Sequence, residues 1–314
     1  MQVFRGIPER AEHGCVLTIG NFDGVHRGHQ ALLARLRAKS LSTGLPAAVL
    51  TFEPHPREYF AHEHRPRRLT SLREKILLLE GQGVDRLYIA RFNRQFAGLT
   101  ADEFVEDVLI HGLGVRHVLI GDDFCFGRGR KGNFSMLKAA GDQVGFGVEA
   151  MHTLDHEGER VSSSAVRTAL ADGDMAHAAR LLGRPYSISG RVMHGDKIGR
   201  TIGFPTANIQ LKHRSPPLMG IYTVSVEGLG ERPLPGVASV GVRPTINDAG
   251  RPSLEVHLFD WSADCYDAHL RINFLRKQRD EERYDSLEAL TAQIARDADE
   301  ARAYFAHHDI QHPF

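Results

Sequence analysis

The sequence predicts an α/β fold in two domains, a parallel sheet covered by helices and then an antiparallel β-barrel with a helix at its end. The chain has 314 residues, more than most single hydrophobic cores contain, so two domains are expected. In the first part, apolar runs alternate with helical patterns, which is typical of a parallel sheet with helices on both faces. From about residue 185, short strand-like stretches are separated by glycine and proline, which indicates an antiparallel barrel.

In the first domain, the expected strands are short apolar runs and the expected helices carry apolar residues on one side. The first helix, for example, has Leu32, Leu33 and Leu36 on one side. In chain order the elements are strand 15–20, helix 29–40, strand 47–52, helix 71–83, strand 85–92, helix 101–114, strand 117–121 and two short helices, 164–171 and 175–182. Each of the two short helices ends at a glycine, as helices often do.

The second domain begins where the pattern changes, so that the domains are predicted to span residues 1–184 and 185–314. Its expected strands are residues 186–193, 206–211, 220–226, 235–242, 253–260 and 269–275. The amphipathic pattern of residues 286–306 predicts a long helix that packs on the barrel. No repeat or low-complexity linker separates the two domains.

The composition excludes several classes of protein. Acidic and basic residues balance at 39 each, which argues against a general polyanion binder, so no nucleic-acid partner is expected. No segment has the layout of a signal peptide, and no apolar run approaches membrane-spanning length. Cys15, Cys125 and Cys265 lack CxxC spacing and are expected to be free thiols in a reducing compartment. The sequence therefore predicts a soluble cytoplasmic protein with no membrane partner.

Two histidines stand three positions apart in NFDGVHRGH, residues 21–29. This stretch lies between the first expected strand and helix, where parallel sheets bind ligands and where a helix start attracts anions. His26 and His29 can point the same way there, and Gly28 lets a ligand come close. If the two histidines bound a metal, a third ligand would be needed, and none lies nearby in the sequence. No Walker or dinucleotide-binding motif is present either. The stretch alone leaves a phosphate site and two ordinary surface histidines as alternatives.

A second stretch, VSSSAVR at residues 161–167, combines three hydroxyl groups with an arginine at an expected helix start. Ser162, Ser163 and Ser164 can cap the helix. They can equally hold phosphate oxygens, with Arg167 supplying the positive charge. By itself this stretch leaves both alternatives open.

The second domain also carries candidate polar residues. PTAN contains Thr206 and Asn208, which lie on one strand face and carry neutral oxygen ligands of the kind that Mg²⁺ accepts. In SLEVHLFD, alternation puts the apolar residues on one face and Glu255 on the other, where it is by itself a solvent-facing glutamate. Gly199 and Gly203 bracket a basic turn that is either a lid over phosphates or a surface loop.

Together the two N-terminal stretches resemble the HxGH and SSTxxR-like signatures of the nucleotidyltransferase superfamily. Further motifs narrow the resemblance to the bacterial bifunctional riboflavin kinase/FMN adenylyltransferases, usually called FAD synthetases. These motifs are TFEPHPREYF and GDDFCFGRGRKGN in the first domain, and GRTIGFPTAN, GIYTV, VGVRPT and SLEVHLFD in the second. The resemblance covers nearly the whole chain. It implies a Rossmann-like nucleotidyltransferase domain followed by a riboflavin kinase barrel with a C-terminal helix.

This resemblance implies an enzyme that phosphorylates riboflavin to FMN with ATP and then adenylylates FMN to FAD, with Mg²⁺ at both steps. Adenylyl transfer needs no general base, because the attacking phosphate is already ionised, so positioning and charge stabilisation suffice. By resemblance, His26 and His29 make transition-state contacts, and Ser163, Ser164 and Arg167 bind the triphosphate. The other implied ATP-binding residues are Gly20, Phe22, Gly28, Asp123, Gly199, Gly203, Thr206 and Asn208.

Phosphorylation of a hydroxyl does benefit from a base, and the resemblance implies Glu255 in that role, with Thr206 and Asn208 as magnesium ligands. A flat, mostly apolar flavin ring suits aromatic and proline-lined walls. The implied flavin-binding residues are Asn21, Asp23, Phe52, Pro54, Pro56, Phe60 and Phe126. For Phe124, by contrast, core packing is expected.

Two positions depart from the family pattern. Ser164 stands where threonine is frequent, which keeps a hydroxyl, and Asp122 stands where an aromatic is common, which adds negative charge beside a phosphate site.

Two rival hypotheses are a nucleotidyltransferase with another acceptor and a flavin-binding or regulatory protein in which one module has lost its chemistry. The expected partners are small-molecule substrates, and the expected state is a monomer or weak homo-oligomer.

Overall fold

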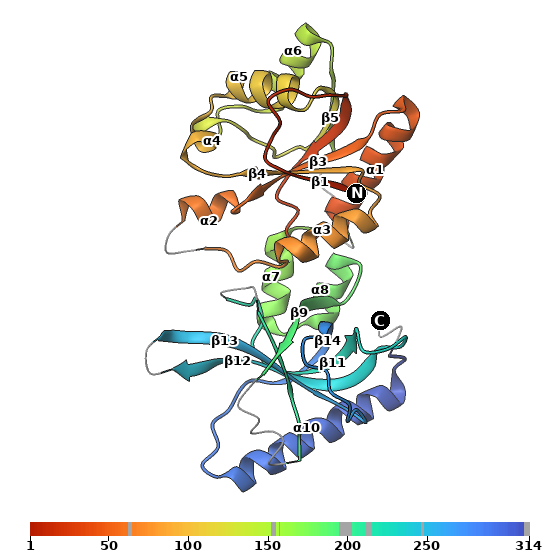
Figure 1. Cartoon of the computed structure of the whole chain (residues 1–314), viewed down its shortest axis with the longest axis vertical. Coiled ribbons are helices and arrows are strands. Elements are labelled where there is room, and N and C mark those ends of the chain that lie inside the picture. Colours follow the sequence, from red (N-terminus) through yellow and green to blue (C-terminus); the bar gives the residue numbers. More distant parts are fainter. Residues whose placement is uncertain are drawn as a thin grey trace. The chain divides into compact units, whose positions relative to one another are not determined.

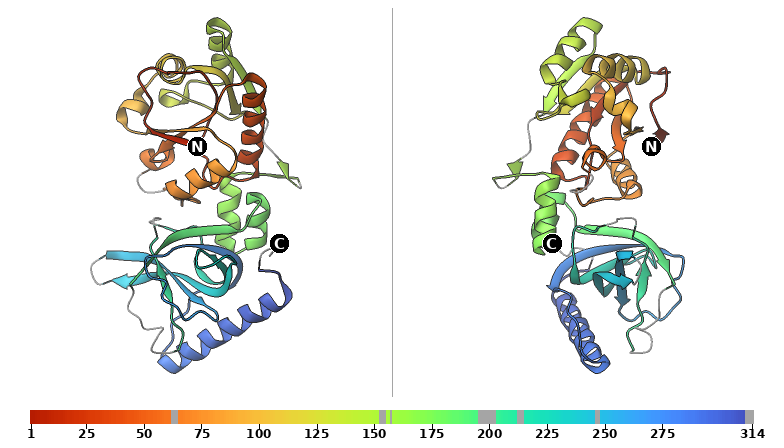
Figure 2. Two further views of the ribbon diagram at one scale, coloured as in Figure 1. Left: turned by 45° about the vertical axis from the view of Figure 1, so that its right-hand side comes forward. Right: turned by 90° about the vertical axis from the view of Figure 1, so that its left-hand side faces the viewer.

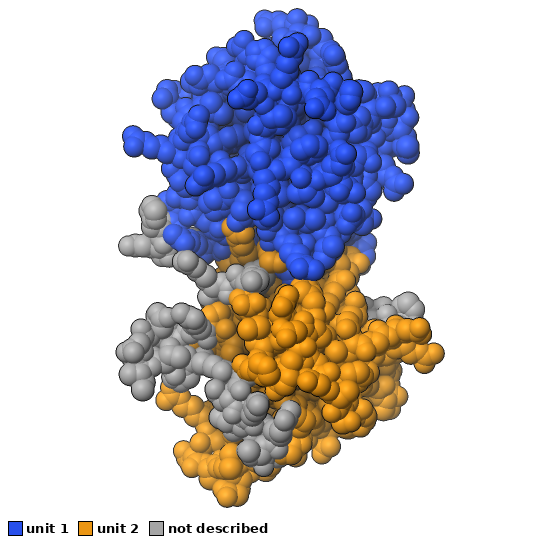
Figure 3. Space-filling model, viewed as in Figure 1, with its two compact units in different colours: residues 1–66, 72–162 blue, residues 67–71, 163–314 orange. Residues whose placement is uncertain are grey.

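The computed structural model describes residues 1–61, 65–151, 155–156, 158–194, 203–211, 215–245 and 248–310. The chain divides into two compact units, which Figure 3 colours separately. Unit 1 comprises residues 1–66 and 72–162, and unit 2 comprises residues 67–71 and 163–314. In the described part of the chain, no helix combines the length and apolar character needed to cross a membrane.

Unit 1 is built on a parallel sheet (Figure 1). Its strands are β1 (Gln2–Arg5), β2 (Cys15–Ile19), β3 (Ala47–Glu53), β4 (Arg86–Arg91), β5 (Val115–Gly121) and β6 (Gly147–Met151). They lie in the order β1-β4-β3-β2-β5-β6, and every neighbouring pair is parallel. The predicted parallel α/β fold is thus confirmed. From β2 the chain continues to β3 on one side and later to β5 on the other, which makes a switch point beyond β2.

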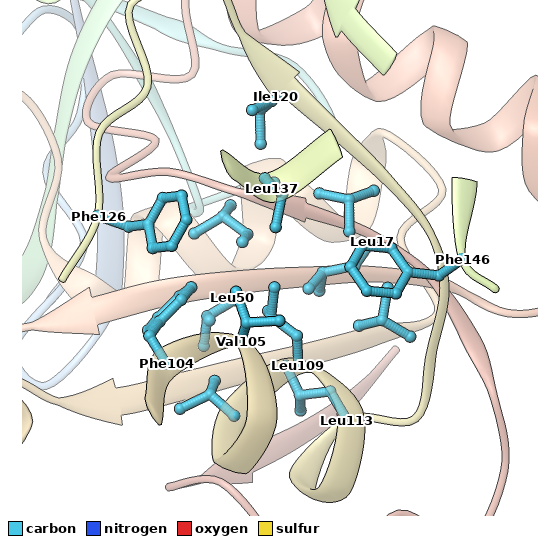
Figure 4. Close-up of a cluster of buried hydrophobic side chains, with 14 of the residues drawn as sticks. Leu17, Leu50, Phe104, Val105, Leu109, Leu113, Ile120, Phe126, Leu137 and Phe146 are labelled. Atoms are coloured by element: carbon cyan, nitrogen blue, oxygen red, sulfur yellow. The ribbon is translucent and has the colours of Figure 1, made fainter. Parts of the chain in front are cut away.

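Helices cover this sheet, and they supply two separate cores. They are α1 (Arg27–Thr43), α2 (Pro56–Phe60), α3 (Leu72–Gly81), α4 (Arg94–Gly98), α5 (Ala101–Glu103), the π-helix η1 (Phe104–Gly112), the 3-10 helix η2 (Arg128–Arg130) and α6 (Phe134–Val144). On β2, Val16 packs with Leu33 and Leu36 of α1, whereas Leu17 packs in the other core with Leu109 of η1 and Leu137 of α6 (Figure 4). Burial on both faces explains why these strands are continuous apolar runs.

The segment predicted as one helix over residues 101–114 forms the short α-helix α5 followed by the π-helix η1. Thr100 caps α5, because its hydroxyl accepts the Glu103 N–H and the Glu103 carboxylate accepts the Thr100 N–H. Further along, the Leu113 N–H donates to the carbonyl of Val108, five residues back, over 3.0 Å. The apolar spacing of this segment does not distinguish the two kinds of turn, so only the backbone pairing reveals the π-helix.

Unit 2 contains the predicted barrel. Its strands are β9 (Tyr186–Met193), β10 (Ala207–Ile209), β11 (Gly220–Glu227), β12 (Leu234–Thr245), β13 (Asp248–Leu258) and β14 (His269–Arg279). They close in the order β10-β13-β12-β11-β14-β9 with antiparallel neighbours, which confirms the barrel. The helices α7 (Ser163–Asp172) and α8 (Met175–Leu182) precede it, and α8 packs against β9 and β14.

The predicted C-terminal helix is α10 (Leu287–His307), and Ser286 caps it. It runs along the outside of the barrel, against β11 and β12 (Figure 2). Its small residues Ala298 and Ala301 pack on Phe259, which follows β13. This contact explains why Phe259 is buried although strand alternation places it on the face opposite the barrel interior.

Candidate functional site

Unit 1 brings the predicted adenylyl-transfer residues to one edge of its sheet. Residues 20–29 follow β2, residues 54–60 follow β3 and residues 122–126 follow β5, and these three strands are neighbours in the sheet. The carboxyl ends of parallel strands share one edge, and ligands bind beyond that edge at the switch point. The three clusters therefore lie where this fold class binds ligands.

The loop that leads into α1 has a strained backbone. Phe22 and Val25 have φ angles of 49° and 41°, and Gly24 between them has 83°. A β-branched residue rarely adopts this left-handed region. Phe22 and Val25 are each only 1% exposed, and the Gln30 side chain donates to the Val25 carbonyl over 2.9 Å. Core packing thus holds a strained loop, and such loops cluster at functional sites.

His26 caps α1 through its side chain. The His29 N–H donates to Nδ1 of His26 over 3.4 Å, so that Nδ1 carries a lone pair and the neutral ring has its proton on Nε2. The two imidazole rings are stacked, with their centroids 3.7 Å apart. A Cβ atom at Gly28 would lie 3.2 Å from the same Nδ1 atom, which is why a glycine separates the pair. The two histidines point the same way, as the spacing predicts.

His29 is held in its neutral form. Burial lowers its pKa well below the usual range, and electrostatic interaction with His26 and Lys75 lowers it further. Among the described residues, the buried Nδ1 atom of His29 and the buried Oδ1 atom of Asn21 have no hydrogen-bond partner. Such atoms are rare in proteins, and these two lie beyond β2, where this fold class binds ligands.

Other loop residues support this arrangement. The Gly20 N–H donates to the carbonyl of Leu50 over 3.0 Å, and the Thr51 hydroxyl donates to the carbonyl of Asn21 over 3.3 Å. Asp23 is 4% exposed. The loop after β2 is therefore fastened to β3, its neighbour in the sheet.

The chain approaches the serine motif beside the histidine loop. A Cβ atom at Gly28 would lie 3.5 Å from the carbonyl oxygen of Val161. One residue earlier, Arg160 donates to the Asp123 carboxylate over 2.9 Å. This exposed ion pair adds little stability, but it joins the loop after β5 to the segment that leads into the motif.

The remaining predicted triphosphate residues open α7 and belong to unit 2. Ser163 and Ser164 lie in its first turn, and Ser164 is exposed. Arg167 lies one turn further on, and its Nε atom donates to the carbonyl of Arg67 over 2.6 Å. Asp122, the departure from the family pattern, is exposed in unit 1 and donates its N–H to the carbonyl of Met151 over 3.1 Å.

Most of the predicted flavin-binding residues gather after β3. Phe52, Pro54 and Pro56 are partly buried there, and Phe60 is 66% exposed. Phe92, which the sequence analysis does not include, joins them, because its ring centroid lies 5.9 Å from that of Phe52 and 5.7 Å from that of Phe60.

Phe126, a predicted pocket residue, is almost fully buried. It is 6% exposed and packs in the core of Figure 4, with its ring centroid 5.3 Å from that of Phe104. Phe124, for which core packing is expected, is partly buried and packs against the same core. A backbone bridge joins Phe126 to Gly132, and the Phe126 ring lies over this glycine, where a side chain would collide with it.

In unit 2, the predicted kinase residues meet on one face of the barrel wall. Leu254 and Val256 on β13 are buried, whereas Glu255 between them is partly exposed, as the alternation predicts. The Thr206 hydroxyl donates to Oε2 of Glu255 over 3.4 Å. Asn208 on β10 stands directly opposite Glu255 on β13.

These three side chains form a set of hard oxygen donors. A hydroxyl, an amide oxygen and a carboxylate suit Mg²⁺, which also keeps water and phosphate ligands. Within the described ranges, no three His, Cys, Asp or Glu side chains gather around one point. Gly203 is exposed with a φ of 85°, and Gly199 lies outside the described residues.

Glu281 is a second carboxylate beside Glu255 that the sequence does not reveal. Ser239 pairs with Glu255 across β12 and β13, and its hydroxyl donates to Oε1 of Glu281 over 3.2 Å. Glu281 is exposed as a whole residue, but partial desolvation of its carboxylate raises its pKa, and the negative charge of Glu255 acts in the same direction. The carboxylate fills the space that a side chain at Gly241 would occupy. In the sequence Glu281 is one acid in a charged run, RKQRDEER, and nothing in that run singles it out.

In unit 1, Lys75 is a charged residue near the candidate site that the sequence does not single out, as Glu281 is in unit 2. It lies on α3 and is 5% exposed, and its Nζ atom donates to the Thr51 hydroxyl over 3.5 Å. Lysine is almost never buried without a partner or a role. A helical pattern marks leucines as buried but gives no sign that a lysine between them is buried too.

Two family models match the chain, one for each set of motifs. The model described as FAD synthetase matches residues 8–165, and the model described as riboflavin kinase matches residues 182–305. The bifunctional riboflavin kinase/FMN adenylyltransferase of Escherichia coli (strain K12) is 51% identical over 309 residues, which cover 97% of this chain and 98% of the relative. The protein of that name from Pseudomonas fluorescens is 52% identical over 308 residues, which cover 98% of each chain.

A solved structure shares this architecture over nearly the whole chain. It is the crystal structure titled a macrolide-efflux protein from Streptococcus pneumoniae, with a TM-score of 0.83 and 30% sequence identity. The match covers 96% of this chain and 99% of that protein. The efflux activity in that title matches neither family model nor the names of the two relatives above, which are more similar in sequence. With both family models in order and half of the residues shared with these relatives, the chain belongs to the bifunctional riboflavin kinase/FMN adenylyltransferase family.

Proposed function

We propose that the chain makes FMN from riboflavin and ATP, and then FAD from FMN and ATP with release of pyrophosphate. The observation that carries this proposal is that the two family matches fall largely on two compact units, each with its own group of candidate side chains. The histidine pair opens α1 in unit 1, and Glu255 lies with Thr206 and Asn208 on the barrel of unit 2.

In the first site, an oxygen of the FMN phosphate bonds to the α-phosphorus of ATP while the bond to pyrophosphate breaks. The attacking phosphate is already ionised, so no side chain has to remove a proton. Neutral His26 donates through Nε2, and His29 presents a polar ring nitrogen beside it. Together with the N–H groups at the start of α1, these rings stabilise the negative charge on the α-phosphate and the leaving pyrophosphate.

We assign Ser163, Ser164 and Arg167 to the triphosphate of the same ATP. Two hydroxyls and a guanidinium supply hydrogen bonds and charge for phosphate oxygens. Gly20, Phe22, Gly28 and Asp123 complete the nucleotide side of this proposal.

The flavin of FMN is proposed to bind along the aromatic residues after β3. The proposed contacts are Asn21, Asp23, Phe52, Pro54, Pro56, Phe60 and Phe126. An unbroken row of rings supports this assignment, because Phe52 and Phe126 are joined through Phe96 and Phe104, with centroid distances of 5.7, 6.2 and 5.3 Å. Phe126 forms the buried end of this row.

In the second site, Glu255 takes the proton of the riboflavin hydroxyl as that oxygen bonds to the γ-phosphorus and the bond to ADP breaks. The Thr206 hydroxyl, 3.4 Å away, orients the carboxylate. Thr206 and Asn208 would hold Mg²⁺, which neutralises phosphate charge when it is bound. Gly199 and Gly203 are proposed to contact the ATP of this step.

We further propose that residues 1–184 carry adenylyl transfer and residues 185–314 carry the kinase reaction. The proposed setting is the cytoplasm, with a monomer or weak homo-oligomer as the active form and no nucleic-acid partner. The balanced charge of 39 acidic and 39 basic residues supports the last point.

Separation of the two activities tests this function. Purified protein is incubated with ATP, Mg²⁺ and either riboflavin or FMN, and the flavins are separated over time. His29→Ala should still phosphorylate riboflavin and accumulate FMN, with adenylyl transfer reduced about a hundredfold or more. Glu255→Gln should lose riboflavin phosphorylation by a factor of about 10² to 10⁴ and still adenylylate supplied FMN.

The exposed residues His111 and Glu288 supply matched controls, because neither lies in a proposed site. His111→Ala and Glu288→Gln should leave both activities within about twofold. Equal loss of both activities in either site variant would count against the division of labour, and wild-type protein that forms neither FMN nor FAD would refute the function itself.

A further inference from the structure

His257 lies on the same face of β13 as Glu255, two residues further along the strand. Its Nδ1 atom lies 2.9 Å from the carbonyl oxygen of Pro205. A carbonyl oxygen accepts hydrogen bonds and cannot donate them, so Nδ1 carries a proton and donates it. The neutral ring therefore has its lone pair on Nε2. The same bond persists when the ring is protonated, because both ring nitrogens are then donors.

Two aromatic rings fix the orientation of this imidazole. The ring centroid of His257 lies 5.3 Å from that of Phe204 and 5.8 Å from that of Phe259, and both contacts are edge-to-face. Phe259 packs with Ala298 and Ala301 of α10, and Phe204 packs against the same cluster. The imidazole is thus held by packing as well as by its hydrogen bond, so the Nδ1–H group keeps one direction.

Thr206 lies just before the paired part of β10. The ladder between β10 and β13 begins with Ala207, which stands opposite Val256. Asn208 follows opposite Glu255 and is therefore placed by strand pairing. Thr206 precedes the first pair of this ladder, so its position depends also on how the chain before it is held.

Pro205 links the imidazole to the predicted metal ligand. A proline has no N–H group, so its carbonyl is its one backbone group for hydrogen bonding. That carbonyl belongs to the planar peptide unit that joins Pro205 to Thr206. A hydrogen bond from His257 to its oxygen therefore fixes the plane from which Thr206 continues. The Thr206 hydroxyl then reaches Oε2 of Glu255 over 3.4 Å.

We propose that His257 is a positioning residue of the riboflavin kinase site, where its bond to the Pro205 carbonyl holds the Thr206 hydroxyl beside Glu255. The inference rests on the kinase function proposed for unit 2. The ligand that it serves is Mg²⁺ with the phosphate oxygens of a nucleotide. His257 acts on that ion through Thr206 and does not touch the reacting atoms.

Three substitutions separate the hydrogen bond of His257 from its packing. His257→Phe keeps a flat ring between the two phenylalanines and removes the donor. His257→Asn places an amide nitrogen where Nδ1 stands, whereas His257→Gln places it near the position of Nε2, which makes these two variants a matched pair. Riboflavin phosphorylation is measured against Mg²⁺ concentration, and adenylyl transfer to supplied FMN in the same preparation is the internal control.

The expected effect is on the Mg²⁺ dependence of the kinase reaction. His257→Phe and His257→Gln should raise the Mg²⁺ concentration for half-maximal phosphorylation about tenfold, because the partners that orient a metal ligand contribute to its affinity by about that factor. His257→Asn should recover most of this loss. The rate at saturating Mg²⁺ should change less, and adenylyl transfer should stay within about twofold.

Two measurements do not depend on turnover. In NMR spectra of the wild-type protein without substrates, the neutral His257 ring should carry its proton on Nδ1 and its lone pair on Nε2. Calorimetric titration with ADP should show that Mg²⁺ strengthens ADP binding less in His257→Phe than in the wild type. Binding of ADP without Mg²⁺ should be the same in both proteins.

The outcomes separate the role of His257 from the function of unit 2. Wild-type protein that forms no FMN refutes the kinase function and with it this role. Active wild-type protein whose Mg²⁺ dependence is unchanged in His257→Phe refutes the role alone, as does a neutral ring with its proton on Nε2. If His257→Phe melts at a lower temperature than the wild type, the matched pair decides, and equal Mg²⁺ dependence in His257→Asn and His257→Gln refutes the role.

Discussion

Asp297 joins the C-terminal helix to the barrel, and its removal tests whether this ion pair holds α10 in place. Its carboxylate is 6% exposed and receives two hydrogen bonds from Arg279 of β14, 2.9 and 2.7 Å long. Gln293 donates a third bond over 2.9 Å. In Asp297→Ala the Arg279 guanidinium, with its side chain 19% exposed, keeps a bond to the Asp280 carbonyl and its place over the Tyr284 ring, 5.9 Å from the centroid.

Breaking a buried ion pair from one side destabilises a protein by about 3 to 5 kcal/mol. The lower end applies here, because Arg279 reaches some solvent and keeps its bond to Asp280. A loss of about 3 kcal/mol in unit 2 lowers its melting temperature by roughly 6 to 12 °C for a unit of this size. Because Glu281 follows Arg279 by two residues, riboflavin phosphorylation should be lost at the same lower temperature.

Calorimetry and residual kinase activity after heating measure this change together. Asp297→Asn keeps the shape of the side chain and should lose about half as much unfolding free energy as Asp297→Ala. On the same helix, Asp299 is exposed, so Asp299→Ala should change the unfolding free energy by less than about 0.5 kcal/mol. A loss below about 1 kcal/mol in Asp297→Ala, or an equal loss in Asp299→Ala, would refute the reasoning.

Three further predictions concern electrostatics, backbone strain and the metal. A hydrogen bond from Lys39 is the largest cause that lowers the pKa of Glu149 from 4.5 to about 2, so its carboxylate stabilises the fold above pH 4.5 and this contribution is lost as the pH falls toward 2. Calorimetry should show that the unfolding free energy falls more steeply on acidification in the wild type than in Glu149→Gln. Parallel plots of unfolding free energy against pH would contradict this. Val25→Gly relieves the strain of a φ of 41° but removes a buried side chain. Chemical unfolding should therefore show a loss of about 1 kcal/mol in unfolding free energy, and this loss should not exceed that of Val25→Ala. Thr206→Ala should raise the Mg²⁺ concentration needed for riboflavin phosphorylation about tenfold without affecting adenylyl transfer, and an unchanged Mg²⁺ dependence would exclude Thr206 as a ligand.

The fold followed from local patterns. Each predicted strand and helix of both units overlaps an element of the structure, because apolar periodicity and glycine or proline breaks are written in contiguous residues. The same holds for the motif at α1, where the spacing of His26 and His29 alone brings both rings to one side of a helix start. Elements with weak patterns were not predicted. One of them is α6, which has Gly141 in its interior because a Cβ atom there would meet the Phe146 carbonyl at 2.5 Å.

By itself, the sequence determined the α/β and barrel architecture, the shared direction of the two histidine rings and the face of the strand that carries Glu255. Only the tertiary structure decided that Lys75 is buried near His29, that Glu281 lies beside Glu255, and that Phe126 is buried more deeply than Phe124 in the same core. The physical reason is that burial and charge depend on contacts between segments far apart in the chain. A periodic pattern shows which side of an element faces inward, but the group that meets it there comes from a different element.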